Sequence, residues 1–224
     1  MEITVLKNVF EKNDNAARDN RRRFDAHGLT CVNILGGAGC GKTSILEAVL
    51  PIVTKSLRVA VLEGDLATTK DAARIADLNV PVVQLLTDGG CHLSATLVEH
   101  ALDRIPLGEL DLLIIENVGN PICPANFDLG EHARISVLSV TEGSDKPSKY
   151  PLLFKEAAAV VLTKCDLLEH TNFDVAEARE DIRRINPRAE VIEMDIKTAG
   201  GIDRLALWLL ARCDAASRST SRGL

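Results

Sequence analysis

Two patterns of apolar residues alternate along the chain. Short apolar runs, bounded by Gly, Pro, Asn or Asp, are separated by longer segments in which apolar residues recur every three or four positions. Short bounded runs indicate buried strands, and the longer spacing indicates helices that bury one face. The runs predict strands at 29–35, 58–63, 80–85, 111–116, 134–140, 158–163 and 189–194.

Helical periodicity fills most of the intervals between these strands. Strands that alternate with helices form a mostly parallel, doubly wound sheet that is flanked by helices. The carboxyl ends of the strands in such a sheet share one edge, and ligands bind there. The predicted fold class is therefore α/β, with helices at 43–56, 68–78, 94–105, 174–186 and 201–213.

The length of 224 residues fits one such domain with a sizeable core better than two. We assign residues 29–214 to this domain and residues 1–28 to a helical extension. Arg21, Arg22 and Arg23 are expected to form a solvated face of that extension, and residues 215–224, rich in Ser and Arg, are expected to be disordered. The extension is predicted to be a polar helix over 6–26, with one apolar stripe made of Leu6, Phe10, Ala17 and Phe24.

The charge balance limits the partners that this chain can have. A net charge of −6 argues against binding to nucleic acid or to an anionic membrane. No apolar run approaches the length of a membrane span, and no signal segment opens the sequence, so a cytoplasmic protein is expected. Disulfides are rare in that compartment. Of the six cysteines, Cys31 and Cys213 are therefore expected to be small core residues.

The segment 36–43, GGAGCGKT, matches the phosphate-binding pattern G-x-x-x-x-G-K-S/T. It follows a predicted strand and opens a predicted helix, which is the context that this loop requires. The backbone N–H groups of a Gly-rich turn bind anionic oxygens, and the positive end of the helix dipole adds to the attraction. Lys42 is predicted to reach the β- and γ-phosphates, and the Thr43 hydroxyl to ligate Mg²⁺. The nucleotide-binding residues predicted from this loop are Gly37, Ala38, Gly39, Cys40, Gly41, Lys42, Thr43 and Ser44.

Carboxylates end two further strands of the predicted sheet. Asp65 closes the sequence Glu63-Gly64-Asp65 and is predicted to reach the Mg²⁺ shell or to orient the attacking water. A helix-capping role for Asp65 is equally open, and the two roles can coexist. In Glu116-Asn117-Val118-Gly119, Glu116 is predicted to hold Mg²⁺ through water, and Gly119 to present its N–H to the γ-phosphate, so that this loop senses hydrolysis. The predicted catalytic residues are Lys42, Asp65 and Glu116, and the predicted Mg²⁺ site is Thr43, Asp65 and Glu116.

The strand at 158–163 runs into Thr163-Lys164-Cys165-Asp166. In GTPases a carboxylate at this place accepts two hydrogen bonds from guanine, a pair that adenine cannot offer. Asp166 is therefore predicted to select GTP, and the Lys164 stem to lie across the base. The usual pattern begins with Asn where this chain has Thr163, and a plain helix cap at Asp166 is the alternative. The segment 195–199, which contains Lys197, occupies the place of a second guanine-contacting loop.

Cys91 and His92 precede the helix predicted at 94–105, and Cys123 lies four residues after Gly119. Thiolate and imidazole are ligands for Zn²⁺, Ni²⁺ or Cu. The nearby helix start is expected to favour the Cys91 thiolate. Two incidental cysteines and a histidine near a helix start explain the pattern about equally well. Three donors per chain leave a metal site incomplete, and a symmetric dimer would complete it.

Taken together, these residues resemble the hydrogenase nickel-incorporation GTPases, the HypB family. The resemblance covers about residues 30–210. Its most specific parts are the runs VLEGDL at 61–66, CHL at 91–93, ENVGN at 116–120, CPA at 123–125 and FDLGE at 127–131.

This resemblance implies a slow P-loop GTPase that uses GTP and Mg²⁺ and dimerises when loaded with GTP. It implies Ni²⁺ or Zn²⁺ at the dimer interface on Cys91, His92 and Cys123. The implied partners are a small nickel- and zinc-binding accessory protein and the large subunit of nickel–iron hydrogenase, to which Ni²⁺ would be delivered. Family members that carry an N-terminal cysteine motif or a His-rich tract bind nickel tightly, and this chain has neither. Lys146 or Lys149 is a further candidate, for contact with a neighbouring subunit's nucleotide.

Three other functions fit parts of the sequence. A urease-type nickel GTPase would favour a Cys-Pro-His motif, which differs from the Cys-His pair and distant cysteine found here. A P-loop kinase or ATPase with structural cysteines would not need the Thr163–Asp166 pattern. A passive scaffold stabilised by zinc would unfold on metal removal, and nucleotide would leave its metal affinity unchanged.

Overall fold

A computed structural model of the chain describes residues 10–66, 68–87 and 89–220, with the last five of these as helical backbone only. Within these residues seven parallel strands form one sheet in the order β3-β2-β4-β1-β5-β6-β7. The predicted α/β class and all seven predicted strands are confirmed. The strands are β1 (Thr30–Gly36), β2 (Val59–Asp65), β3 (Val82–Leu86), β4 (Leu112–Glu116), β5 (Ala133–Ser139), β6 (Ala157–Thr163) and β7 (Glu190–Glu193).

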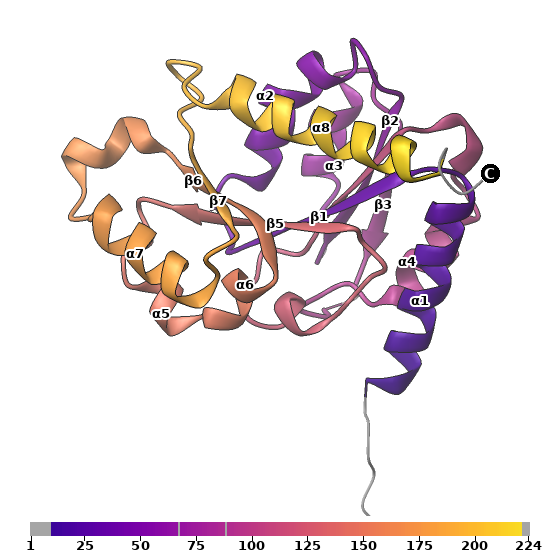
Figure 1. Cartoon of the computed structure of the whole chain (residues 1–224), viewed down its shortest axis with the longest axis horizontal. Helices are drawn as coiled ribbons and strands as arrows, with labels where there is room; N and C mark the ends of the chain where they lie inside the picture. Colours follow the sequence, from indigo (N-terminus) through magenta and orange to yellow (C-terminus); the bar gives the residue numbers. More distant parts are fainter. Residues whose placement is uncertain (1–9, 67, 88, 221–224) are drawn as a thin grey trace, which may run out of the picture.

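Helices cover both faces of the sheet, as Figure 1 shows. One face packs against α2 (Lys42–Val53), α3 (Lys70–Ala76) and α8 (Ile202–Thr220). The other face packs against α1 and α4 near one edge and against α6 and α7 near the other. The strands of this sheet are buried on both sides, and for this reason their sequences are nearly continuous apolar runs. The second face carries α1 (Glu11–Ala26), α4 (Ala95–Leu102), α5 (Lys146–Lys149), α6 (Pro151–Lys155) and α7 (Val175–Ile185).

The N-terminal helix is held to the domain by polar contacts as well as by its apolar stripe. Ala17 and Phe24 are buried, whereas Phe10 is exposed and Leu6 lies outside the described residues. Of the predicted solvated arginine face, Arg22 is exposed, whereas Arg21 and Arg23 are half-buried. Arg21 pairs with Asp128, and Arg23 pairs with Asp103 at the end of α4. A sequence pattern does not show such pairs because the partners lie far away along the chain.

The carboxyl-terminal helix is longer than its apolar periodicity indicates. α8 continues to Thr220, where disorder from 215 onward was expected, and residues 221–224 lie outside the described part. Among the described residues, no helix is long and apolar enough to cross a membrane.

Candidate nucleotide and metal sites

The phosphate loop connects β1 to α2, as its sequence predicts. Gly39 and Gly41 have φ values of +71° and +102°, a left-handed backbone that favours glycine. At Gly36 a Cβ atom would lie 2.7 Å from Cys40 Sγ and 2.8 Å from Val137 O, so only glycine fits. Burial raises the pKa of Cys40 to about 11, and its thiol sits in the core beneath the loop. Cys40 therefore contributes its backbone to this loop and no thiolate chemistry.

A cavity of about 540 Å³ opens over this loop at the carboxyl edge of the sheet. It gathers the loop after β1, the ends of β2 and β4, and residues of α3. Asp65, Glu116, Gly119 and Lys164 line it, although they are far apart in the sequence. Gly37, Cys40, Asp166 and Lys197 do not line it. The phosphate-loop residues on its wall are Ala38, Gly39, Gly41, Lys42, Thr43 and Ser44.

Two buried carboxyl groups lie side by side at the base of the cavity. Glu63 on β2 is in register with Glu116 on β4, and Thr43 Oγ1 donates a 2.8 Å hydrogen bond to Glu116 Oε1. Glu63 Oε2 and Glu116 Oε2 are buried and have no hydrogen-bond partner among the described residues. Unpartnered carboxyl oxygens beside a threonine hydroxyl are the hard donors that Mg²⁺ prefers, so these residues fit a magnesium site. Sequence reasoning passed over Glu63, and only the strand register places it beside Glu116.

Burial raises the pKa values of Glu63 and Glu116 to about 7, and for Glu63 the charge of Glu116 adds to this effect. The ordinary value is 4.5, so the folded protein holds a proton at Glu63 more tightly than the unfolded chain does. This contribution to stability is fully present below pH 4.5 and is lost as the pH rises through about 7. A glutamine side chain cannot ionise and has no such dependence.

Glu63→Gln is therefore expected to gain stability relative to the wild type as the pH rises from about 4.5 to about 7.5. The gain in free energy of unfolding is at most about 3 kcal/mol, because one pKa unit corresponds to about 1.4 kcal/mol. Urea denaturation of the nucleotide-free protein in EDTA, repeated over this pH range, measures it. A difference that stays constant with pH would contradict the buried, raised-pKa carboxyl described above.

Asp65 takes part in a local turn while it lines the cavity. Its Oδ1 accepts a hydrogen bond from Leu66 N at 2.6 Å, and its Oδ2 accepts from Thr68 N and Thr68 Oγ1. α3 begins later, with Thr69 as its N-terminal neighbour. Asp65 thus shapes the turn before α3, and its predicted contact with Mg²⁺ or water stays a prediction.

The two predicted guanine loops lie next to each other. Lys164 has a left-handed φ of +59°, and its Nζ donates to Gly39 O at 2.8 Å. Thr163, at the place where Asn is usual, donates from Oγ1 to Cys40 O at 2.6 Å and so ties β6 to the phosphate loop. Lys197 Nζ pairs with Asp166 Oδ2 at 2.7 Å. This ion pair joins the two loops through Asp166 and Lys197, the two side chains predicted to contact guanine.

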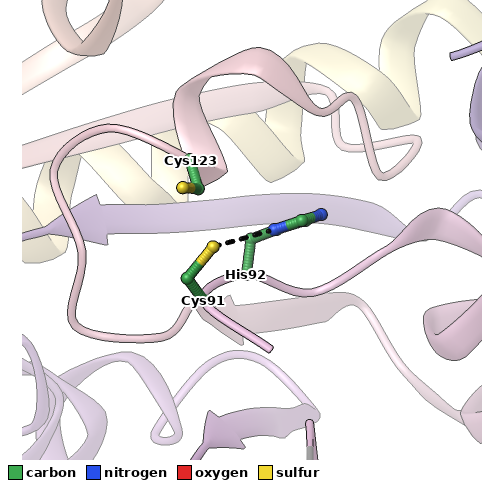
Figure 2. Close-up of side chains that lie close together, drawn as sticks. All are labelled: Cys91, His92 and Cys123. Atoms are coloured by element: carbon green, nitrogen blue, oxygen red, sulfur yellow. Dashed lines mark hydrogen bonds between the residues drawn. The ribbon is translucent and has the colours of Figure 1, made fainter. Parts of the chain in front are cut away.

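Cys91, His92 and Cys123 come together from two loops. Cys91 and His92 lie between β3 and α4, and Cys123 precedes the short 3₁₀ helix Pro124–Asn126. One donor atom from each lies within 4.8 Å of the other two, and Cys91 Sγ is 3.6 Å from His92 Nδ1. Figure 2 shows the Cys91 thiol directed at His92 Nδ1, with the Cys123 side chain beside it. All three side chains are half-buried, so this cluster of soft donors fits Ni²⁺ or Zn²⁺ and remains within reach of a second chain.

The surroundings of the cluster set the protonation of its donors. Burial lowers the pKa of His92, which favours the neutral imidazole that binds metals. The His92 ring stacks on Phe127 at 3.8 Å between centroids, and Phe10 meets the same Phe127 edge-on. The expectation of a favoured Cys91 thiolate was wrong for the metal-free protein. A hydrogen bond with Cys123 and burial raise the Cys91 pKa, and α4 begins only at Ala95.

The loop that holds Cys91 and His92 and the loop that holds Cys123 are called the ligand loops below. Both ligand loops also contact residues of the nucleotide cavity. A Cβ on Gly119 would lie 2.9 Å from Ala38 Cα, so the predicted sensor loop packs directly on the phosphate loop. Asn120 then forms a backbone bridge with Gly36, and its side chain accepts from Cys123 N at 3.4 Å. The Cys91–His92 loop contacts the cavity wall through the side chain of Leu93. This side chain packs on Gly64, which lines the cavity, and would lie 2.8 Å from a Cβ atom there. The loops that carry the metal cluster thus pack against residues of the cavity wall, although the three donors themselves do not line the cavity.

The candidate lysines before β6 are the first and last residues of the short helix α5. Lys149 pairs with Asp145, and Lys146 lies 5.3 Å from the centre of the Tyr150 ring. Contact of either lysine with a neighbouring subunit's nucleotide stays a prediction.

Known proteins share the sequence and the fold of this chain. Residues 30–193 match the family described as the CobW/HypB/UreG nucleotide-binding domain. The hydrogenase maturation factor HypB of Azotobacter vinelandii is 44% identical over 92% of this chain and 68% of its own length. The structure of HypB from Helicobacter pylori in complex with nickel superposes with a TM-score of 0.87, at 37% identity, over 92% of this chain and 96% of that one. HypB from Archaeoglobus fulgidus superposes with a TM-score of 0.85, at 36% identity, over 90% of this chain and 98% of that one.

Proposed function

Because this chain belongs to the CobW/HypB/UreG family and resembles its hydrogenase maturation factors over nearly its whole length, we propose that it is a GTP-hydrolysing nickel chaperone. In this proposal it binds Ni²⁺ at a dimer interface formed with GTP and helps to insert the ion into nickel–iron hydrogenase. The observation that carries the proposal is the shared architecture of the two sites. The loops that hold Cys91, His92 and Cys123 pack on the walls of the nucleotide cavity.

The residues of the cavity have separate parts in the proposed hydrolysis. Lys42, whose Nζ lies 3.4 Å from Gly37 O, turns back over the loop toward the place of the β- and γ-phosphates. Thr43, Glu116 and Glu63 would hold Mg²⁺, and that ion would neutralise charge on the phosphates. Gly119 offers its N–H beside the phosphate loop. In this proposal the buried carboxyl groups of Glu63 and Glu116 on the cavity wall serve Mg²⁺ instead of acting as a general base, so slow hydrolysis is expected.

Asp166→Asn is expected to lower the affinity for GTP by about 10- to 100-fold, because an amide cannot accept both guanine donors. Its affinity for ATP, already weak in the wild type, should change little. Competition between GTP, ATP and a fluorescent nucleotide measures both values, and Asp203→Asn on exposed α8 is the matched control. Equal binding of GTP and ATP by the wild type would contradict guanine selection. An unchanged GTP affinity in Asp166→Asn would contradict the role of this carboxylate.

The metal cluster is proposed to act across two chains. Three donors leave at least one coordination position open, and a second copy related by two-fold symmetry brings the same three donors. Nickel is proposed as the cargo because the similar Helicobacter pylori protein forms a complex with it. Delivery would involve a small nickel- and zinc-binding accessory protein and the hydrogenase large subunit.

The proposal is tested by following nickel release in a single turnover. Protein loaded with Ni²⁺ and GTP is mixed with a chromophoric chelator, and phosphate and chelated nickel are recorded together. Nickel release at the rate of hydrolysis, and none with a non-hydrolysable analogue, is the expected result. Release at the same rate with both nucleotides would refute the proposed coupling and favour a scaffold with structural metal. Family membership argues against the kinase and partition-ATPase alternatives.

A further inference from the structure

A chain of polar side chains runs below the two ligand loops. Asn117 follows β4, Asn33 lies in β1, Glu131 precedes β5, and Arg134 lies in β5; we call these four residues the polar relay. Asn117 Nδ2 donates to Asn33 Oδ1 at 3.4 Å, and Asn33 Nδ2 donates to Glu131 Oε1 at 3.2 Å. Arg134 Nε donates to the same Glu131 oxygen at 2.5 Å. Asn117 and Asn33 are 1% and 0% exposed, so the relay is part of the interior.

Each end of the polar relay holds one of the ligand loops. At one end Asn117 Oδ1 accepts hydrogen bonds from Leu93 N at 3.2 Å and from Val118 N at 3.0 Å. Leu93 directly follows His92, and Val118 belongs to the loop that packs on the phosphate loop. At the other end Arg134 donates to Ala125 O at 3.1 Å and to Phe127 O at 2.9 Å. These carbonyls lie just after Cys123, and Phe127 carries the ring that stacks on His92.

Stability alone does not account for the polar relay. Buried polar side chains are no better for stability than well-packed apolar ones, and they cost free energy whenever one partner is lost. What such a network supplies is a defined geometry, because each hydrogen bond constrains the next. Here the constrained segments are the two metal-binding loops and the segment that packs against the phosphate loop.

We propose that Asn117 is a positioning residue that couples the nucleotide state to the geometry of the Cys91, His92 and Cys123 cluster through the polar relay. A shift of Val118 and Gly119 on loss of the γ-phosphate moves the Asn117 amide. That amide holds Leu93 on one side and Asn33 on the other, so both ligand loops respond together. The inference rests on the proposed function, since it supplies a route for its nucleotide–metal coupling.

The test compares Asn117→Leu with the matched variant Asn186→Leu. Asn186 is also a buried asparagine, and it donates to Phe154 O and Ala157 O. Ala157 pairs with Arg134 in the sheet, but the Asn186 side chain donates to no member of the polar relay and to neither ligand loop. Nickel affinity is measured with GDP and with a non-hydrolysable GTP analogue, and nucleotide affinity is measured beside it. The wild-type nickel affinities in the two states are expected to differ by about 5- to 150-fold. Asn117→Leu is expected to reduce this ratio by at least about threefold, while Asn186→Leu keeps it.

Two results separate the inference from the function on which it rests. A coupled wild type with the same ratio in a folded Asn117→Leu protein would overturn the relay and leave the proposed function standing. A wild-type ratio of one would refute the coupling itself, and with it the proposed function.

A measurement on the wild type covers the case in which Asn117→Leu does not fold. Hydrogen–deuterium exchange follows the Leu93 and Val118 amides in the GDP and analogue states. The inference predicts that the protection of both amides changes together, because one oxygen accepts from both. A change at Val118 with none at Leu93 would overturn it.

Discussion

Alanine at position 91 or 123 is expected to weaken Ni²⁺ binding by about 100-fold or more. Each substitution removes one of two thiols from a cluster of three donors whose atoms lie within 4.8 Å of one another. Losing a residue that only orients a ligand costs about 10- to 100-fold in metal affinity, so losing a ligand costs at least the upper end of that range. Guanine nucleotide affinity should stay within about twofold, because neither cysteine lines the nucleotide cavity.

Competition with a chelator of known affinity measures the nickel effect in each nucleotide state. The matched control is Cys213→Ala, which removes a buried thiol from α8 on the opposite face of the sheet. If Cys91→Ala and Cys123→Ala both bind Ni²⁺ like the wild type, the three side chains do not form the nickel site. The nickel-chaperone proposal would then lose its metal site.

Lys42→Ala is expected to slow GTP hydrolysis by about 1,000-fold. Lys42 is only 7% exposed and lies at the start of α2, on the wall of the cavity. A preorganised positive charge at the phosphates stabilises charge that develops in the transition state, and removing one such group costs about 100- to 1,000-fold. The upper end applies here because Lys42 is buried, where a charge acts on the phosphates more strongly than it does in water.

Phosphate release at saturating GTP, with one turnover observed, measures this loss separately from weaker binding. Lys55→Ala, which removes an exposed lysine after α2, is the control and should hydrolyse GTP like the wild type. Hydrolysis by Lys42→Ala at more than about a tenth of the wild-type rate would contradict the assigned role. Another cation would then have to stabilise the charge that develops on the phosphates.

The sheet and the phosphate loop could be predicted because their signals are local. Buried parallel strands are continuous apolar runs, and the loop motif fixes the residue types at every constrained position. The short helices α5 and α6 were not predicted, because Pro147 and Pro151 make that segment look like a turn. Their helical turns depend on packing against α7, which periodicity over four or five residues does not show.

The metal cluster could be predicted only in part. The sequence supplies the donor types, but Cys91 and Cys123 lie 32 positions apart, and only the fold brings their thiols together. Glu63 and the polar relay were missed for a related reason. Asn33 lies inside an apolar strand and Glu131 in a loop, so their link through a buried hydrogen bond depends on strand neighbours. A role that depends on contacts between neighbouring strands leaves no pattern in the sequence around the residue.

Nickel titration in two nucleotide states tests the central claim most directly. The protein is loaded with GDP or with a non-hydrolysable GTP analogue, and Ni²⁺ affinity, stoichiometry and molecular mass are recorded together. The account predicts a dimer with the analogue and a nickel affinity that differs at least about fivefold between the states. Equal affinity, equal stoichiometry and the same mass in both states would contradict it, and would leave an NTPase whose cysteines do not respond to the nucleotide.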